Sequence, residues 1–140
     1  MEKLIEIGKD YDYIIDATDN FGSRFIINEY CVKNEKTLIF GAVKGFLGQV
    51  SVFKPWKNDN PCYACFNPNI VGEDFSLPLK EKGILGAVAG SIGALQATTA
   101  VKEILGIGES LVGKILISDF LNNKYRVTTL KKSQNCPVCR

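Results

Sequence analysis

The chain has 140 residues, of which 46% are hydrophobic and 23% are charged, values ordinary for one soluble globular domain with a hydrophobic core. Its formal net charge is only +2, from 17 basic and 15 acidic residues, so no strong field argues for a nucleic acid or an anionic membrane as partner. The absence of histidine excludes histidine-based catalysis and histidine metal ligands.

The first third of the chain predicts a parallel β-α-β unit. Residues 13–15 are a short apolar run that ends at Asp16, which is typical of a strand buried on both faces. Residues 17–20 are rich in helix-capping side chains, and residues 21–33 carry apolar side chains at helical spacing. Residues 37–43 form a second buried strand, so the crossover between the strands is expected to be right-handed.

Antiparallel pairing is predicted for the rest of the chain. Residues 45–53 alternate in hydrophobicity, as a strand with one buried face does. Residues 112–118 and 125–130 are two further candidate strands, with a hairpin turn at residues 122–123. Residues 54–82 are rich in proline and asparagine and predict a long loop, and long ordered loops are commonly functional.

A helix is expected over residues 83–105. Its uncharged part, residues 84–101, spans 18 residues, at the short end for a membrane span, and contains Gln96, so we expect a buried helix of a soluble protein. Its glycines are expected to let another backbone approach closely. Residues 1–10 are too charged for a signal peptide, and the cytoplasm is the default compartment.

Four of the five cysteines form two CxxC pairs, Cys62 with Cys65 and Cys136 with Cys139. Each pair places two thiolates on one side of a tight loop, and two such loops complete a closed tetrahedral site for one structural zinc ion. A redox pair and disulfides are the alternatives, but a redox motif needs one CxxC that opens a helix, and neither pair opens an obvious one. The zinc would tie the long loop to the C-terminus. Cys31 is expected to be a small core residue.

The acidic turn after the first strand supports two interpretations. Ligands of open α/β sheets bind beyond the carboxyl ends of strands, where Asp19 can ligate Mg²⁺ and the helix N-terminus after Asn20 can face phosphate. Alternatively, Thr18, Asp19 and Asn20 only cap the helix, which the local pattern favours. The glycines of the chain are spaced GxxxGxxG rather than GxGxxG, so no glycine-rich nucleotide loop supports the first interpretation.

Five ordered motifs resemble one family. The stretch from Ile15 to Phe21, with Arg24 and Asn28, resembles the DATDN…R…N stretch of the ThiF/MoeB/HesA proteins, the bacterial relatives of ubiquitin-activating enzymes. The resemblance covers essentially the whole chain. The other motifs are Gly48-Gln49-Val50 before Phe53, Pro61-Cys62-x-x-Cys65, the glycine-rich helix with Gln96-Ala97 and Lys102, and Cys136-Pro137-x-Cys139.

The resemblance implies an α/β fold, the C-terminal half of a Rossmann-type fold. A short parallel β-α-β unit would be continued by antiparallel strands, with a four-cysteine zinc knuckle. Residues 1–140 would form a single domain, the C-terminal portion of an adenylating domain. The implied activity is ATP-dependent adenylation of the C-terminal Gly-Gly carboxylate of a ubiquitin-like sulfur-carrier protein, as in thiamine or molybdopterin biosynthesis.

The resemblance also implies roles for individual residues. Asp19 would contact Mg-ATP as the catalytic residue, and Asn20 and Arg24 would help to bind the nucleotide. Residues 41–49 and the loop after Cys65 would border the channel for the tail of the carrier. The zinc would be a clip away from the ATP chemistry, which relies on positioning and charge neutralisation.

Two departures from the family pattern set the remaining expectations. The Rossmann-like half that carries the glycine-rich loop is absent from this sequence, so we expect no adenylation by the chain alone. Residues 75–83 contain no cysteine, so thioester or persulfide chemistry there is unsupported. The chain is then half of an activating enzyme that needs an N-terminal partner, a non-enzymatic zinc-stabilised module that binds a ubiquitin-like tail, or a degenerate remnant. Exposed apolar surface would favour a homodimer.

Overall fold

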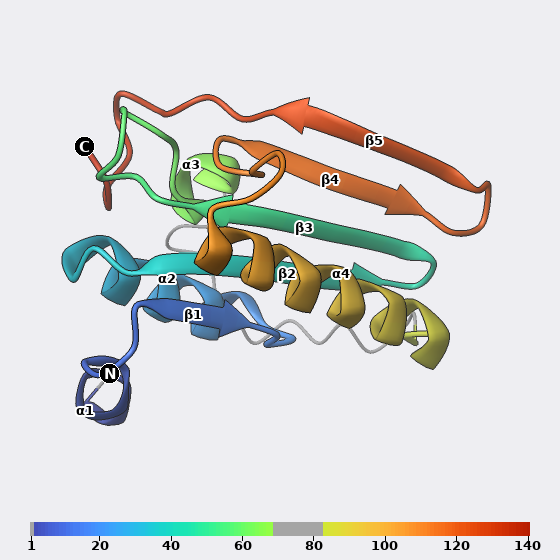
Figure 1. The fold of residues 1–140 in the computed structure, drawn as a ribbon, viewed down its shortest axis with the longest axis horizontal. Helices are drawn as coiled ribbons and strands as arrows, with labels where there is room; N and C mark the ends of the chain where they lie inside the picture. The colour runs from blue at the N-terminus through green and yellow to red at the C-terminus, as the bar shows by residue number, and fades with distance from the viewer. Residues whose placement is uncertain (1, 69–82) are drawn as a thin grey trace.

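The computed structural model describes residues 2–68 and 83–140 of the chain. Five strands form one mixed sheet, in the order β1-β2-β3-β4-β5, with α4 lying across the face turned toward the viewer in Figure 1. The elements are α1 (Glu2–Gly8), β1 (Tyr13–Asp16), α2 (Phe21–Lys33), β2 (Thr37–Lys44), β3 (Leu47–Phe53), α3 (Tyr63–Phe66), α4 (Gly86–Leu105), β4 (Lys114–Asp119) and β5 (Lys124–Thr129).

The parallel β-α-β unit predicted from the sequence is present. Strands β1 and β2 pair in parallel, with Ile15 opposite Ile39, and α2 connects them over the predicted residues 21–33. The other neighbouring strands pair in antiparallel fashion. Asn123 in the β4–β5 hairpin has a φ of 53°, a conformation that asparagine tolerates in tight turns. The predicted α/β fold, a short parallel unit continued by antiparallel strands, is therefore confirmed.

The core has two layers, one on each face of the sheet, because successive residues of a strand point in opposite directions. Leu38 and Phe40 pack in one buried cluster with Tyr30 of α2. Ile39, which lies between them in the sequence, packs with Ala100 of α4. The middle of the sheet is thus covered on both faces, by α2 on one side and α4 on the other.

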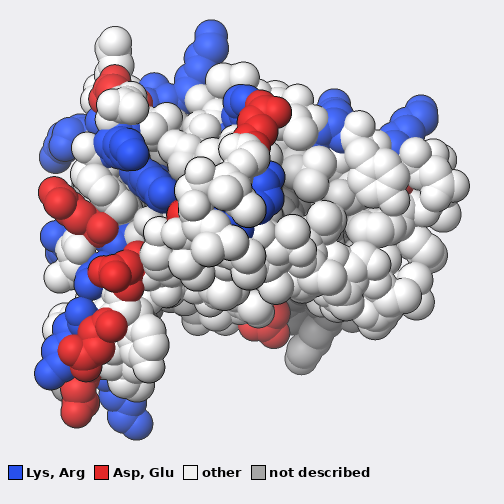
Figure 2. All heavy atoms as spheres, in the orientation of Figure 1, with Lys and Arg blue, Asp and Glu red and all other residues white. Residues whose placement is uncertain are grey.

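Helix α4 is not the buried helix that the sequence predicts, because only one of its faces packs on the sheet. The outward face is exposed, including Val101 at 52% and Ile104 at 58%. Figure 2 shows few charged side chains over α4, whereas charged side chains gather at the left of the same view. The sequence does not distinguish the two faces of α4, because both carry small, uncharged residues. No helix within residues 2–68 and 83–140 is long and apolar enough to cross a membrane. The buried positions of α4 recur every four residues, at Val88, Ile92, Gln96 and Ala100.

Close approach between α4 and the sheet depends on glycines of the sheet rather than on those of the helix. A Cβ placed on Gly90 of α4 meets nothing within 4 Å, whereas a Cβ on Gly48 of β3 would lie 2.2 Å from Cδ1 of Ile92. The expectation that the helix glycines admit another backbone is therefore wrong among the described residues. Glycine at position 48 instead makes room for a helix side chain.

Strand β1 also departs from its prediction, because one face is open rather than buried. Among the described residues β1 pairs only with β2, so it is an edge strand. Ile15 is 53% exposed, although its partner Ile39 is fully buried. A short apolar run looks the same in the sequence whether the strand is central or lies at an edge with one face exposed.

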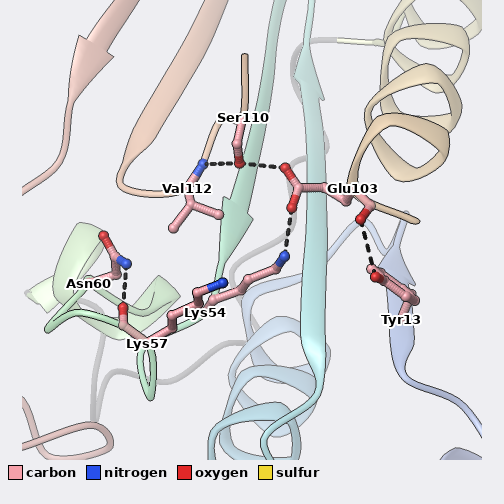
Figure 3. Close-up of polar contacts among 7 residues, drawn as sticks. All are labelled: Tyr13, Lys54, Lys57, Asn60, Glu103, Ser110 and Val112. Atoms are coloured by element: carbon pink, nitrogen blue, oxygen red, sulfur yellow. Dashed lines mark hydrogen bonds and ion pairs between the residues drawn. The ribbon is translucent and has the colours of Figure 1, made fainter. Parts of the chain in front are cut away.

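The C-terminal end of α4 is fastened to β3 by a buried ion pair (Figure 3). Lys54 Nζ lies 2.6 Å from Glu103 Oε2, and the two side chains are only 17% and 6% exposed. Ser110 Oγ donates to the other carboxylate oxygen of Glu103, and the Tyr13 hydroxyl donates to its carbonyl oxygen at 3.2 Å. Glu103 therefore joins the end of α4 to β1, to β3 and to the segment before β4.

We expect Lys54→Met to lower the free energy of unfolding by about 3 kcal/mol, because it leaves the buried Glu103 carboxylate without its counter-charge. Urea unfolding of the variant measures this loss. Lys33→Met is the matched control: it removes the same charge from an exposed pair with Glu29, which is worth less than about 1 kcal/mol. Equal effects of the two substitutions would contradict a structural role for the buried pair.

Candidate functional site

A cavity of about 550 Å³ opens at the carboxyl ends of β1 and β2, where open α/β sheets bind ligands. Its walls come from the acidic turn, both strands of the β2–β3 hairpin, α3 and α4. Residues 41–44, Leu47 and Gln49 line it, so the stretch expected to border a channel does border the cavity. Phe66 and Asn67 line it after Cys65, and the rest of that loop, residues 69–82, lies outside the described residues.

The acidic turn is shaped by hydrogen bonds that leave one carboxylate at the cavity. Asp16 Oδ1 accepts from the backbone N–H and the hydroxyl of Thr18, at 2.9 and 2.7 Å. Asn20 is the N-cap of α2, and its Oδ1 accepts from the Ser23 N–H at 2.8 Å. Asp19 accepts from the Asn20 side chain at 3.2 Å and lines the cavity. Capping, the interpretation favoured by the local pattern, is thus the work of Asn20 and leaves Asp19 available to a ligand.

Arg24 holds the acidic turn against the sheet. Its Nη2 donates to the carbonyl oxygen of Thr18 at 2.7 Å, and its guanidinium lies 5.5 Å from the ring centre of Phe40. The Arg24 side chain lines the cavity, and its Nε is buried without a hydrogen-bond partner among the described residues. Burial raises the pKa of the nearby Tyr63 phenol, and the positive charge of Arg24 partly offsets that rise.

Gln96 joins α4 to the two parallel strands β1 and β2 below the cavity. Its Nε2 donates to the carbonyl oxygens of Asp16 at 2.6 Å and Ile39 at 3.0 Å. These carbonyls belong to β1 and β2, so one amide spans the parallel pair. The contact needs glycine at position 41, because a Cβ there would lie 2.5 Å from Gln96 Oε1.

The four paired cysteines lie together at the other end of α2 from the acidic turn. Their sulfur atoms are all within 4.8 Å of one another, with Cys62 Sγ 3.6 Å from Cys136 Sγ and Cys65 Sγ 3.4 Å from Cys139 Sγ. Four sulfurs at about 2.3 Å from a tetrahedral zinc would be about 3.8 Å apart. The cysteines are free thiols rather than disulfides, and the donor set fits a closed metal site.

The fifth cysteine, Cys31, lies apart from this cluster. Cys31 is a core residue on α2, as predicted, and burial raises its pKa to about 12, so the thiolate needed for nucleophilic chemistry is suppressed. Burial also raises the pKa of Cys62, to about 11. A cysteine must lose its proton to bind a metal, so the metal affinity of the four thiols falls as the pH falls.

The turn that carries the first cysteine pair also contributes residues to the cavity wall, although none of the four cysteines lines the cavity among the described residues. Cys62 is the N-cap of α3, a single helical turn, so the first CxxC pair opens a short helix, contrary to the expectation that neither pair does. Tyr63 and Phe66, which directly follow Cys62 and Cys65, both line the cavity. The turn that presents two metal ligands thus also builds one wall of the cavity.

Comparison with known proteins fits this arrangement. The model of the ThiF family matches residues 1–138. The chain belongs to the ThiF family. A sulfur carrier protein adenylyltransferase of Thermus thermophilus is 38% identical over 99% of this chain and 52% of its own length. An adenylyltransferase and sulfurtransferase MOCS3-2 of Zea mays is 39% identical over 96% of this chain and 28% of its own length. This ThiF-family chain therefore spans about half, or less, of the length of these relatives.

Solved structures show the same fold for this ThiF-family chain. Escherichia coli MccB with ATP aligns at a TM-score of 0.78 and 20% identity, over 99% of this chain and 42% of its own length. The microcin C7 biosynthetic enzyme MccB in complex with N-formylated MccA aligns at 0.79 and 19%, over 99% of this chain and 44% of its own length.

Two parts of the site in this ThiF-family chain had no predicted role. Gln96 interrupts an apolar face whose other members recur every four residues, and such a polar residue signals a buried hydrogen bond. The sequence contains no comparable signal for Tyr63, because the CxxC spacing indicates a role for the two cysteines and not for the residues between them. Its place in the cavity wall depends on where the turn packs.

We expect Gly41→Ala to destabilise the chain by about 1–3 kcal/mol, because the new methyl group displaces the Gln96 amide from the carbonyl oxygens of β1 and β2. Thermal or urea unfolding measures the change. Gly90→Ala is the matched control, since its methyl group meets none of the described residues within 4 Å and it should stabilise an exposed helix position by up to about 1 kcal/mol. A neutral Gly41→Ala would show that the amide is not held there.

We expect one zinc ion per chain, and none in Cys136→Ser, which removes one sulfur from the set of four. Elemental analysis of the purified proteins measures the metal, and unfolding with and without a chelator measures its contribution to stability. Cys31→Ala removes the fifth cysteine and should retain one zinc ion. Zinc loss in Cys31→Ala, or its retention in Cys136→Ser, would contradict the assigned ligands.

Proposed function

We propose that this chain is part of an ATP-dependent adenylyltransferase that activates the C-terminal Gly-Gly carboxylate of a ubiquitin-like sulfur-carrier protein. The observation that carries the proposal is the cavity at the carboxyl ends of β1 and β2, which Asp19 and Arg24 line. Family membership and relatives named as sulfur carrier protein adenylyltransferases support the reaction class. The pathway is of the thiamine or molybdopterin type, in the cytoplasm.

The proposed chemistry joins a carrier carboxylate to AMP. A carboxylate oxygen attacks the α-phosphorus of ATP, the bond from that phosphorus to pyrophosphate breaks, and an acyl-adenylate forms. Asp19 would hold the Mg²⁺ of Mg-ATP at the mouth of the cavity, since carboxylate oxygens suit this cation. Asn20 and Arg24 would fix the turn that carries Asp19 and help to bind the nucleotide, so that catalysis is mainly positioning and charge neutralisation.

The four cysteines, Cys62, Cys65, Cys136 and Cys139, would hold a structural zinc ion. A shell of four thiolates has no open position for water or substrate, so the zinc would supply stability and no chemical step. The sulfur separations of 3.4–4.0 Å between neighbouring cysteines support this assignment.

We further propose that residues 1–140 are one domain that is completed by a second, nucleotide-binding half. The chain covers 52% of the sulfur carrier protein adenylyltransferase of Thermus thermophilus, so about half of that protein has no counterpart here. The open edge of β1 and the exposed Ile15 offer a place for a further strand. The exposed apolar face of α4, with Val101 and Ile104, would support a homodimer.

A non-enzymatic module that binds a ubiquitin-like tail is the second candidate. It is favoured by one observation: all four cysteine sulfurs and the cavity wall that they support lie within this chain. Binding of a sulfur carrier by this chain without a nucleotide-binding half would favour this candidate. Dependence of carrier binding on that half would favour the enzyme.

We expect no ATP–pyrophosphate exchange from the chain alone with a sulfur carrier, and exchange once a family nucleotide-binding half is added. In the reconstituted protein, Asp19→Asn should lower the exchange rate by about 100-fold or more, because it removes a charge that positions the metal-bound triphosphate. Radiolabelled pyrophosphate incorporated into ATP measures the rate.

Asp10→Asn is the control for this experiment, because Asp10 is an exposed aspartate that does not line the cavity. Its exchange rate should equal that of the unmodified protein. Full exchange in Asp19→Asn would remove Asp19 from the mechanism. Exchange by the chain alone would show that no second half is needed.

A further inference from the structure

Helix α2 runs from the acidic turn to the cysteine cluster, so one element contacts both parts of the site. Asn20, Arg24 and Asn28 are spaced four residues apart and therefore lie along one face of the helix. Asn20 caps the helix, and Arg24 binds the turn at Thr18. Asn28, one turn further on, is 1% exposed and faces the first cysteine pair.

The Asn28 amide makes two hydrogen bonds, one to Cys62 of this pair and one to Tyr63, the residue that follows it. Its Nδ2 donates to Cys62 Sγ at 3.6 Å, and its Oδ1 accepts from the backbone N–H of Tyr63 at 2.9 Å. The first contact stabilises negative charge on a sulfur ligand, as outer-shell groups of metal sites do. The second fixes the start of α3 relative to α2.

Helix α3 cannot hold its position unaided. It contains four residues, and a single helical turn in isolation is unstable. Its position is set by the two sulfurs, by Asn28 and by ring packing, in which the centre of Tyr63 lies 5.1 Å from that of Phe40 and 5.3 Å from that of Phe25. Phe40 also contacts the guanidinium of Arg24, so a shift of α3 reaches the turn that carries Asp19.

We propose that Asn28 is a positioning residue that couples the four-cysteine centre to the cavity, so that metal bound at the centre orders the cavity wall. Metal fixes Cys62 and Cys65, Asn28 locks this pair to α2, and Tyr63 and Phe66 are thereby held in the wall. On the function proposed above, zinc raises the affinity for ATP, and ATP raises the affinity for zinc by the same factor, because coupling between two binding sites is reciprocal.

Asn28→Asp tests the proposal with almost no change of shape. The carboxylate can still accept from the Tyr63 N–H, but it replaces a donor by a negative oxygen beside Cys62 Sγ. The variant should bind zinc about 10-fold or more weakly, measured by competition with a chelator. Asn34→Asp is the matched control: it changes the same side chain on α2, where Asn34 donates to the Tyr30 carbonyl, and should leave zinc affinity unchanged.

Amide hydrogen exchange of the unmodified chain, with zinc and after chelation, tests the coupling even if Asn28→Asp fails to fold. Zinc removal should speed exchange in residues 62–67 and also in residues 17–24, while the β4–β5 hairpin keeps its protection. Faster exchange confined to the two CxxC segments would overturn the proposal, as would unchanged zinc affinity in a folded Asn28→Asp.

The reconstituted protein separates this proposal from the proposed function. Zinc affinity is measured with and without ATP, and ATP affinity with and without zinc. Equal, reciprocal increases support both proposals. A protein whose amide hydrogen exchange responds to zinc but that binds no ATP would contradict the proposed adenylyltransferase function. It would still support the coupling between the four-cysteine centre and the cavity wall. A protein that binds ATP equally well with and without zinc would overturn the coupling.

Discussion

The amide of Gln96 donates to the carbonyl oxygens of Asp16 and Ile39, and the cavity exists where it does because of this contact. The two carbonyls belong to neighbouring parallel strands, and Asp16 is the last residue of β1, so a single side chain fixes α4 over the point where β1 gives way to the acidic turn. The arrangement requires that position 41 have no Cβ. Breaking these two buried hydrogen bonds would leave polar groups without partners, which is costly in free energy. The contact therefore gives the floor of the cavity a defined shape.

The walls of the cavity are held by contacts of a different kind. Arg24 binds the acidic turn through the Thr18 carbonyl, and Asn28 binds the first cysteine pair through Cys62 and Tyr63. Both side chains belong to α2, so the turn and the cysteine cluster are positioned by one rigid helix. The position of Asp19 therefore also depends on the contacts of Asn28, which lies about two helical turns further along α2.

The stability of the sheet is distributed unevenly around this site. The middle of the sheet is covered on both faces, and the ion pair between Lys54 and Glu103 closes the end of α4 away from the cavity (Figure 3). The edge of β1 and the outward face of α4 are open, with Ile15 and Val101 more than half exposed. Exposed apolar side chains of this size are expected where a protein associates with another chain or domain.

The sequence by itself determined the order of the five strands with α2 and α4, the parallel unit followed by antiparallel strands, and the set of four cysteines that come together. These follow from short-range patterns: the period of apolar residues, the capping residues after Asp16, and the spacing within each CxxC pair. It did not determine which face of α4 is covered or that β1 is an edge strand, because apolar runs are alike whether or not a partner is present. Nor did it assign Tyr63 to the cavity wall or Asn28 to Cys62. Those contacts join residues more than 30 positions apart, and only the packing of α2 against α3 brings them together.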